Sequence, residues 1–96
     1  MQPLSTNRIS TDETKRASNL AKHGIDLADC ESVFDFPMST IEDDREAYGE
    51  QRLKSLCWLD DRVVVLIWTD RDTGPHLISC RYGDKRETNR YIEETH

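Results

Sequence analysis

The chain lacks the long apolar run that a membrane-spanning helix needs. Such a helix takes about 20 consecutive apolar residues, whereas the longest run here, VVVLIW at 63–68, has only the length of a strand. The opening residues, MQPLSTNRIS, also lack the basic start and apolar stretch of a secretory signal. We therefore expect a cytoplasmic protein that does not engage a membrane.

Cysteine is scarce, and its spacing does not fit a disulfide or zinc framework. Three cysteines are odd in number and form no C-x-x-C pair: Cys30, Cys57 and Cys80. The histidines are equally scattered and show no metal-ligand spacing: His23, His76 and His96. A Gly-rich phosphate loop, a G-x-S-x-G elbow and internal repeats are all missing. The sequence thus predicts reduced thiols, no metal site and no cofactor.

What the chain does have is charge. Of its 96 residues, 33% are charged and only 35% are hydrophobic, so much of its surface must be charged. This length supports one modest core and no second unit. Residues 1–8 are polar and aperiodic and are expected to form a loose arm, and residues 9–96 are expected to form a single domain.

Two helices are expected before the strands. Ser10 and Glu13 have capping-box spacing and Gly24 follows His23, so a first helix should begin near 10–12 and run to His23. A second, shorter helix should follow, with these residues as its cap, apolar stripe and stop: Asp26, Leu27, Cys30, Val33, Phe34 and Pro37.

Strands dominate the second half of the chain. A brief strand within 39–50 and three longer ones at 52–59, 62–69 and 76–82 are expected to form an antiparallel sheet. Simple alternation in the last strand puts Leu77, Ser79 and Arg81 on one face and the remaining residues on the other: His76, Ile78, Cys80 and Tyr82.

A final helix should follow the sheet. Asp84 and Glu87 have capping-box spacing, and a thin apolar face is expected from Thr88, Tyr91 and Ile92. The fold class is therefore α+β, with two N-terminal helices, an antiparallel sheet of three to four strands and a C-terminal helix.

Positive charge gathers near the end of an otherwise acidic chain. The net charge is −6, yet the stretch ISCRYGDKRETNRY at 78–91 carries +2 and leaves −8 for the rest. Its cations are Arg81, Lys85, Arg86 and Arg90. A polyanion would be expected to dock here, because Arg81 directly precedes a helix start that offers backbone N–H groups to a phosphate.

These residue types suit RNA cleavage without a metal. That reaction needs a base for the 2′-hydroxyl, cations for the pentacovalent phosphate and an acid for the leaving oxygen. Histidine is the side chain whose unperturbed pKa is close to neutral, so His23 could take the proton. These cations could stabilise charge: Lys22, Arg52, Arg81 and Arg86. Three residues could bind a nucleotide or handle a proton: Glu50, Glu87 and Tyr91. Glu87 could equally be only a capping residue, and Tyr91 only a core residue.

Several separated motifs resemble the BrnT family of toxins. They are DETKRASNLAKHGIDL at 12–27, VFDFP at 33–37, GEQR at 49–52 and ISCRYGDKRETNRY at 78–91. The family positions fall here on Asp12, Lys15, Asn19, Lys22, His23, Gly24, Gly49, Glu50, Arg52, Ile78, Ser79, Arg81, Glu87 and Tyr91. The chain departs from the family pattern at Ile9 and Thr11, where aromatic residues are frequent in the family. It also departs at Gly83, where alanine is frequent in the family.

The resemblance implies a RelE-like fold and a ribonuclease toxin of a type II toxin–antitoxin system. Such a toxin cleaves RNA, suppresses translation and is neutralised by a BrnA-like antitoxin with a DNA-binding ribbon–helix–helix part, so DNA is reached only through the antitoxin. The catalytic residues expected are Arg81, Arg52, Lys22, His23 and Glu50, and the expected substrate-binding residues are Arg86, Lys85, Tyr91 and Glu87.

Two other classes of function fit the sequence. A catalytically inactive BrnT-like interaction or regulatory module would explain the acidic surface, although Lys22, His23, Arg52 and Arg81 then have no obvious purpose. A DNA-binding regulator is the weaker alternative, because no expected helix carries the cations and amides that groove reading needs.

Overall fold

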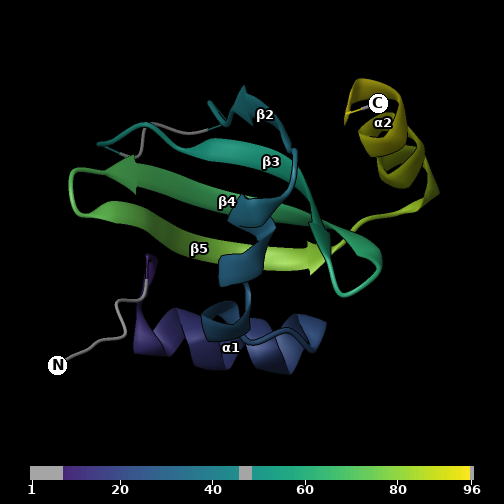
Figure 1. Cartoon of the computed structure of the whole chain (residues 1–96). Helices are drawn as coiled ribbons and strands as arrows, with labels where there is room; N and C mark the ends of the chain where they lie inside the picture. Colours follow the sequence, from purple (N-terminus) through teal and green to yellow (C-terminus); the bar gives the residue numbers. More distant parts are fainter. Residues whose placement is uncertain (1–7, 46–48, 96) are drawn as a thin grey trace, which may run out of the picture.

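A five-stranded sheet lies between helices on its two faces in the computed structural model, which describes residues 8–45 and 49–95 (Figure 1). The elements in chain order are β1 (Ser10–Thr11), α1 (Glu13–His23), η1 (Leu27–Asp29), η2 (Glu31–Asp35), β2 (Ser39–Glu42), β3 (Leu53–Leu59), β4 (Arg62–Arg71), β5 (Gly74–Tyr82) and α2 (Lys85–Thr95). The strand order across the sheet is β1-β5-β4-β3-β2.

The α+β class is confirmed, but the sheet is larger than expected and mixed. Strands β2 to β5 pair antiparallel, whereas β1 pairs parallel with β5. Ser10 therefore begins a strand and does not cap the first helix. The cap is Asp12, whose carboxylate accepts hydrogen bonds from the backbone N–H groups of Thr14 and Lys15 at 2.8 and 3.2 Å. Helix α1 ends as expected at Gly24, which adopts the left-handed conformation with φ 72°.

The expected second helix is replaced by the two short 3₁₀ helices η1 and η2. Asp26 caps the first of them by accepting from the backbone N–H of Ala28 at 2.9 Å. The buried residues Leu27, Cys30 and Val33 are spaced by three, which matches the three residues per turn of a 3₁₀ helix. That period points all three into the core, whereas an α-helix would rotate them apart.

The sheet separates two apolar clusters. The larger lies under α1 and the 3₁₀ helices and contains Leu27, Val33, Cys57, Leu66 and Leu77 among its buried residues. The smaller lies under α2 and consists of Leu56, Val63, Val65, Tyr91 and the packed ring of Trp58. Figure 1 shows α1 running beside β5 and α2 near the other side of the sheet, by β3. The central strand β4 is buried on both faces, as its continuous apolar sequence predicts.

A β-bulge in β5 changes which residues share a face. Ile67 of β4 pairs with Ser79, but its neighbour Trp68 pairs with Leu77, so Ile78 is the extra residue. Leu77 therefore lies in the larger core cluster, on the same face as Cys80. The simple alternation expected for this strand is wrong before Ile78, and the bulge is the reason.

Asn19 holds α1 against the outer edge of β5. Its side-chain amide donates to the carbonyl of Cys80 at 2.9 Å and to that of Ile25 at 2.8 Å, and its oxygen accepts from the Cys80 N–H at 2.9 Å. Asn19 is only 4% exposed. One side chain thus satisfies backbone groups that a further strand would otherwise pair.

Helix α2 begins with the expected capping box. Glu87 N–H donates to the Asp84 carboxylate at 2.8 Å, and Asp84 N–H donates to the Glu87 carboxylate at 2.9 Å. Of the expected apolar face, Tyr91 is buried but Ile92 is 46% exposed, because the helix touches the sheet through a single narrow stripe.

The expected arm, 1–8, lies outside the described residues except for Arg8, which forms ion pairs with Glu31 and Asp35 at 2.9 Å each.

Candidate active site

Part of the sheet on the α2 side carries polar and cationic side chains. We call it the open face and define it by Lys54, Ile67, Thr69, His76, Ser79 and Arg81. We add Arg52, which precedes Lys54 by two residues and falls on the same side by alternation. Strand pairing defines this face, since residues directly opposite each other on neighbouring strands point to the same side. Helix α2 lies near the end of the sheet where β5 finishes, away from the β4–β5 turn (Figure 1).

A pocket of about 110 Å³ is hollowed into the open face, and we call it the Arg81 pocket. Its cations come from three different segments: Arg45 from the loop after β2, Lys54 from β3 and Arg81 from β5. Its remaining lining is Val65, Ile67 and Ser79. Three cations around a small pocket with a partly apolar floor make a local anion-binding environment in an acidic chain.

Arg81 is oriented by Glu87. The two side chains form a bidentate ion pair, with both N···O distances at 2.9 Å, and Arg81 also donates to the Tyr82 carbonyl at 3.3 Å. The guanidinium of Arg81 and the Asp84 N–H hold the pKa of Glu87 low, at about 2. Glu87 is thus both capping residue and partner of Arg81, and it is a carboxylate at neutral pH.

Arg52 and Glu50 lie at the other end of the open face. Arg52 is half-buried just before β3, and its carbonyl accepts from the Asp43 N–H at 2.7 Å. Glu50 is paired with Arg71 at 2.9 Å. That hydrogen-bonded pair lowers the pKa of Glu50, and the nearby charges of His76 and Arg52 lower it further.

His76 also belongs to the open face. It pairs with Thr69 in the sheet, and the bulge at Ile78 places it on the same face as Arg81. Its Nδ1 shares a hydrogen bond of 2.8 Å with the Ser10 hydroxyl. Burial, followed by the charge of Arg71, lowers the pKa of His76 below its ordinary value. At neutral pH its imidazole is therefore predominantly neutral and able to accept a proton.

The pairing arranges these side chains in three rows. Arg81 lies opposite Val65, Ser79 opposite Ile67 with Lys54 beyond, and His76 opposite Thr69. The outer rows are separated by four residues of β4, or roughly 13 Å at about 3.3 Å per residue. A group bound over the middle row can thus be approached by long side chains from both ends of the open face.

Lys22 and His23 lie elsewhere. With Lys15, Ser18, Asn19, Ile78 and Ser79 they line a separate pocket of about 220 Å³ between α1 and β5, which we call the α1 pocket. Lys22 and His23 are therefore not brought into the Arg81 pocket. The two pockets share one lining residue, Ser79.

The sequence of the chain matches one known family. A family model described as the ribonuclease toxin BrnT of type II toxin–antitoxin systems matches residues 12–87. The chain belongs to the BrnT family. No curated protein is significantly similar to the chain. Membership of a type II system implies a protein antitoxin as partner. The matched range includes every residue that lines the Arg81 pocket and the α1 pocket.

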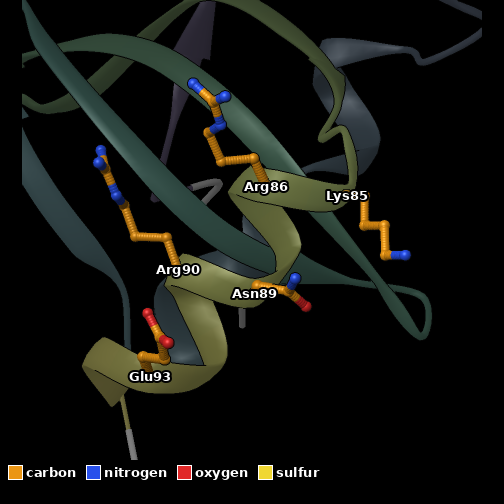
Figure 2. A pocket seen from close by; sticks show the side chains of 5 residues that line it. All are labelled: Lys85, Arg86, Asn89, Arg90 and Glu93. Carbon is orange, nitrogen blue, oxygen red and sulfur yellow. The ribbon is translucent and has the colours of Figure 1, made fainter.

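The helix α2 presents the other cations of the charged stretch on its outer surface. An open concavity of about 500 Å³ is lined by Lys85, Arg86, Asn89, Arg90 and Glu93, which all project from this single helix (Figure 2). Lys85 points away from Arg86 and Arg90 (Figure 2). Residues of one helix cannot enclose a ligand, so this surface is a less convincing reaction site than the Arg81 pocket.

Tyr91 has a structural environment. Its ring stacks with that of Trp58 at a centroid distance of 6.2 Å, and its hydroxyl donates to the Pro37 carbonyl at 2.8 Å. Desolvation raises its pKa. We leave Tyr91 out of the site proposed below.

Sequence reasoning missed three members of this BrnT site: Arg45, Lys54 and His76. Lys54 could have been found, because it alternates with Arg52 on the same strand face. Arg45 comes from an acidic loop, and only its position after β2 brings it to the pocket. His76 was out of reach, because simple alternation puts it on the opposite face.

Two absences complete the description of the site. Within 8–45 and 49–95, no group of three or more His, Cys, Asp or Glu side chains is placed to ligate a metal. Among the same residues, no helix is long and apolar enough to cross a membrane.

Proposed function

We propose that this BrnT-family chain is a metal-independent endoribonuclease toxin that cleaves RNA on the open face. The observation that carries the proposal is the Arg81 pocket, where Arg45, Lys54 and Arg81 converge, together with Arg52 on the same face of the sheet. Guanidinium and ammonium groups around a small hollow suit a phosphodiester, whose charge increases in the transition state.

The proposed reaction uses the substrate's own 2′-hydroxyl as nucleophile. Its oxygen bonds to the adjacent phosphorus while the bond from phosphorus to the 5′-oxygen breaks, and the departing 5′-oxygen takes a proton from water. The products are a 2′,3′-cyclic phosphate and a 5′-hydroxyl. Arg81 and Arg52 stabilise the pentacovalent phosphate from the two ends of the open face, and Lys54 lies between them.

His76 is the proposed general base. Its Nδ1 is engaged by Ser10, which leaves Nε2 to accept the 2′-hydroxyl proton when Nδ1 carries the hydrogen. The depressed pKa of His76 supports this role, because a neutral imidazole is required. Glu50 lies within electrostatic reach of His76 and Arg52 and would favour their charged forms as the reaction proceeds. Glu87 is a positioning residue that acts through Arg81.

In the cell, the proposed toxin acts in the cytoplasm, inhibits translation by destroying RNA and is neutralised by a BrnA-like antitoxin. We propose that DNA is bound only by the ribbon–helix–helix part of that antitoxin. Membership of the family supports these proposals.

The test is expression of the chain alone in a bacterial culture, compared with Arg81→Ala, followed by electrophoresis of total RNA. The wild type should arrest growth and degrade RNA. Arg81→Ala should do neither, since loss of one transition-state donor lowers rates about 10²–10³-fold. The matched control is Arg62→Ala, which removes an exposed sheet arginine outside the open face whose guanidinium lies 3.7 Å from the Tyr82 ring centroid. It should remain toxic.

Purified protein supplies the decisive measurement. Wild type should cleave RNA in the presence of a chelator, and both variants must show native circular dichroism before their rates are compared. Normal cleavage by folded Arg81→Ala and Arg52→Ala proteins would reject the proposed site. Loss of activity on chelation, restored by metal, would reject metal independence alone.

A non-catalytic interaction module is the second candidate, and one observation favours it. Arg81 and Glu50 are already engaged by Glu87 and Arg71, respectively, so a substrate would have to compete with these ion pairs. A soluble, folded wild-type protein that binds its antitoxin but leaves growth and RNA intact would support this function.

A further inference from the structure

The α1 pocket is built from one face of a helix and the neighbouring strand. Lys15, Ser18 and Lys22 are spaced by three and four residues, so they project from the same side of α1. Opposite them, Ser79 comes from β5, and His23 closes the end of the pocket. Its lining therefore combines ammonium groups, hydroxyls and an imidazole, and it includes no carboxylate.

The base of the α1 pocket is fixed before any ligand arrives. Asn19 lines the pocket, and its side-chain amide N–H groups donate to the carbonyls of Cys80 and Ile25. Its side-chain oxygen accepts from the Cys80 N–H. These three bonds set the position of α1 relative to the edge of β5. A charged ligand would thus meet side chains on two rigid elements, which lowers the cost of ordering the pocket.

The lysines of the α1 pocket are available to a ligand. Both Lys15 and Lys22 are exposed, and neither forms an ion pair with another residue in the described ranges 8–45 and 49–95. In contrast, Arg81 and Arg45 of the other pocket are each held by a carboxylate at 2.9 and 2.7 Å. The α1 pocket therefore offers ammonium groups that can bind an anionic ligand directly. In the Arg81 pocket, the carboxylates instead hold the guanidinium groups in fixed positions.

We propose that the α1 pocket is a second phosphate subsite for the RNA strand that is cleaved on the open face. Ser79 lines both pockets, so a strand whose reacting phosphate lies in the Arg81 pocket can pass over the edge of β5 and place a further phosphate between Lys15 and Lys22. The inference rests on the proposed function and deepens it: Lys22 and His23 bind the strand beside the reaction and take no part in proton transfer.

The subsite also addresses how so acidic a chain holds RNA. With a net charge of −6, the protein repels a polyanion over most of its surface, and association depends on the few places where cations are concentrated. Two adjoining cationic pockets act together on one strand, because the second contact becomes intramolecular once the first has formed.

The test compares wild type with Lys15→Gln/Lys22→Gln, and with Arg62→Gln as a control for loss of an exposed cation outside both pockets. The binding probe is a short, fluorescein-labelled, 2′-O-methylated RNA of random sequence, which cannot be cleaved because it has no free 2′-hydroxyl. Its anisotropy is followed over a range of salt concentrations. Cleavage of unmodified RNA is measured in parallel.

The expected result for the double variant is a weaker salt dependence. One lost phosphate contact reduces the slope of log K against log salt by about 0.7 for a single strand, which is roughly a five-fold loss of affinity at 0.1 M salt. In cleavage, KM should rise while kcat stays near the wild-type value, since the reacting phosphate is unaffected. Arg62→Gln should keep the wild-type slope.

Each remaining outcome is decisive. If the wild type binds and cleaves RNA but the double variant keeps its affinity, slope and KM, the subsite is rejected and the proposed function stands. If kcat falls with KM unchanged, Lys15 or Lys22 acts in the reaction and the subsite is equally rejected. If folded wild type neither binds nor cleaves RNA, the proposed function fails and the subsite fails with it.

Discussion

Replacement of Asn19 by alanine tests whether one buried amide fixes the position of α1 against the sheet. The change removes two donated hydrogen bonds, to the carbonyls of Ile25 and Cys80, and one accepted from the Cys80 N–H. Because Asn19 is only 4% exposed, water cannot simply replace its amide unless α1 moves. The backbone N–H and C=O of Cys80 would then lack hydrogen-bond partners at the edge of β5, beneath α1.

The expected cost is a large fraction of the total stability. Each of the three lost hydrogen bonds costs about 1 kcal/mol if its backbone group finds a new partner, and about 1–3 kcal/mol if that buried group stays unpaired. With one of the three groups left unpaired, the cost is about 3–5 kcal/mol. Alanine returns up to about 0.7 kcal/mol through its higher helix propensity. We expect a net loss of about 3 kcal/mol from a total that is typically about 5–15 kcal/mol, which corresponds to a fall in Tm of roughly 15 °C.

Urea denaturation followed by circular dichroism measures this loss. Asn89→Ala is the matched control, because Asn89 is an exposed residue of the other helix and its replacement should change stability by no more than a few tenths of a kcal/mol. A loss below about 1 kcal/mol in Asn19→Ala would refute the reasoning, since it would mean that the edge of β5 finds other partners easily.

Two further predictions follow from shifted pKa values. The pKa of Glu87 is lowered from 4.5 to about 2 in the folded chain, so its ion pair with Arg81 stabilises the protein above pH 4.5 and ceases to do so as the pH falls towards 2. In urea titrations at neutral pH, the free energy of unfolding of wild type should exceed that of Glu87→Gln by about 1–2 kcal/mol, after allowance for the partly exposed Arg81. This difference should shrink as the pH falls from 4.5 to about 2. A difference that does not change with pH would argue against the ion pair. Burial raises the pKa of Cys57 to about 12, and Cys80 is also raised, by its hydrogen bond with Cys30 and by burial. None of the three thiols should react with an aromatic disulfide reagent in native protein at pH about 8, whereas all three should react in urea, and rapid native reaction would show that the core opens.

The sequence predicts most of the fold because its signals are local. The capping box of α2, the left-handed Gly24 and the apolar run of β4 each depend on residues a few positions apart, and each is present as expected. The parallel strand β1 was missed because two residues carry no period. Its partners, His76 and Leu77, lie more than sixty residues away in the chain.

The candidate site was less predictable, since pockets depend on register. Arg81 lies on a strand as expected, whereas Arg52 lies just before β3 and outside it. Alternation with Arg52 could have revealed Lys54, but no local pattern reveals that Arg45 joins them from a loop. Likewise, the motif containing Lys22 and His23 could be recognised in sequence. That it lines a different pocket follows only from the packing of α1 on the edge of β5.

The bulge at Ile78 illustrates how one extra residue can decide the chemistry of a site. If Ile78 were instead paired regularly, a strand that places Arg81 on the open face would turn His76 towards α1 and the larger core cluster, where a titratable side chain would be costly to bury. With it, Leu77 enters that core, and His76 reaches the face that holds Arg52 and Arg81. A core residue and a proposed general base thus depend on the same irregularity. Deletion of Ile78 would remove the extra residue itself and leave Leu77 directly beside Ser79, opposite Trp68 and Ile67. Simple alternation would then keep Leu77 in the core and His76 on the open face, so the deletion variant should retain native circular dichroism and RNA cleavage.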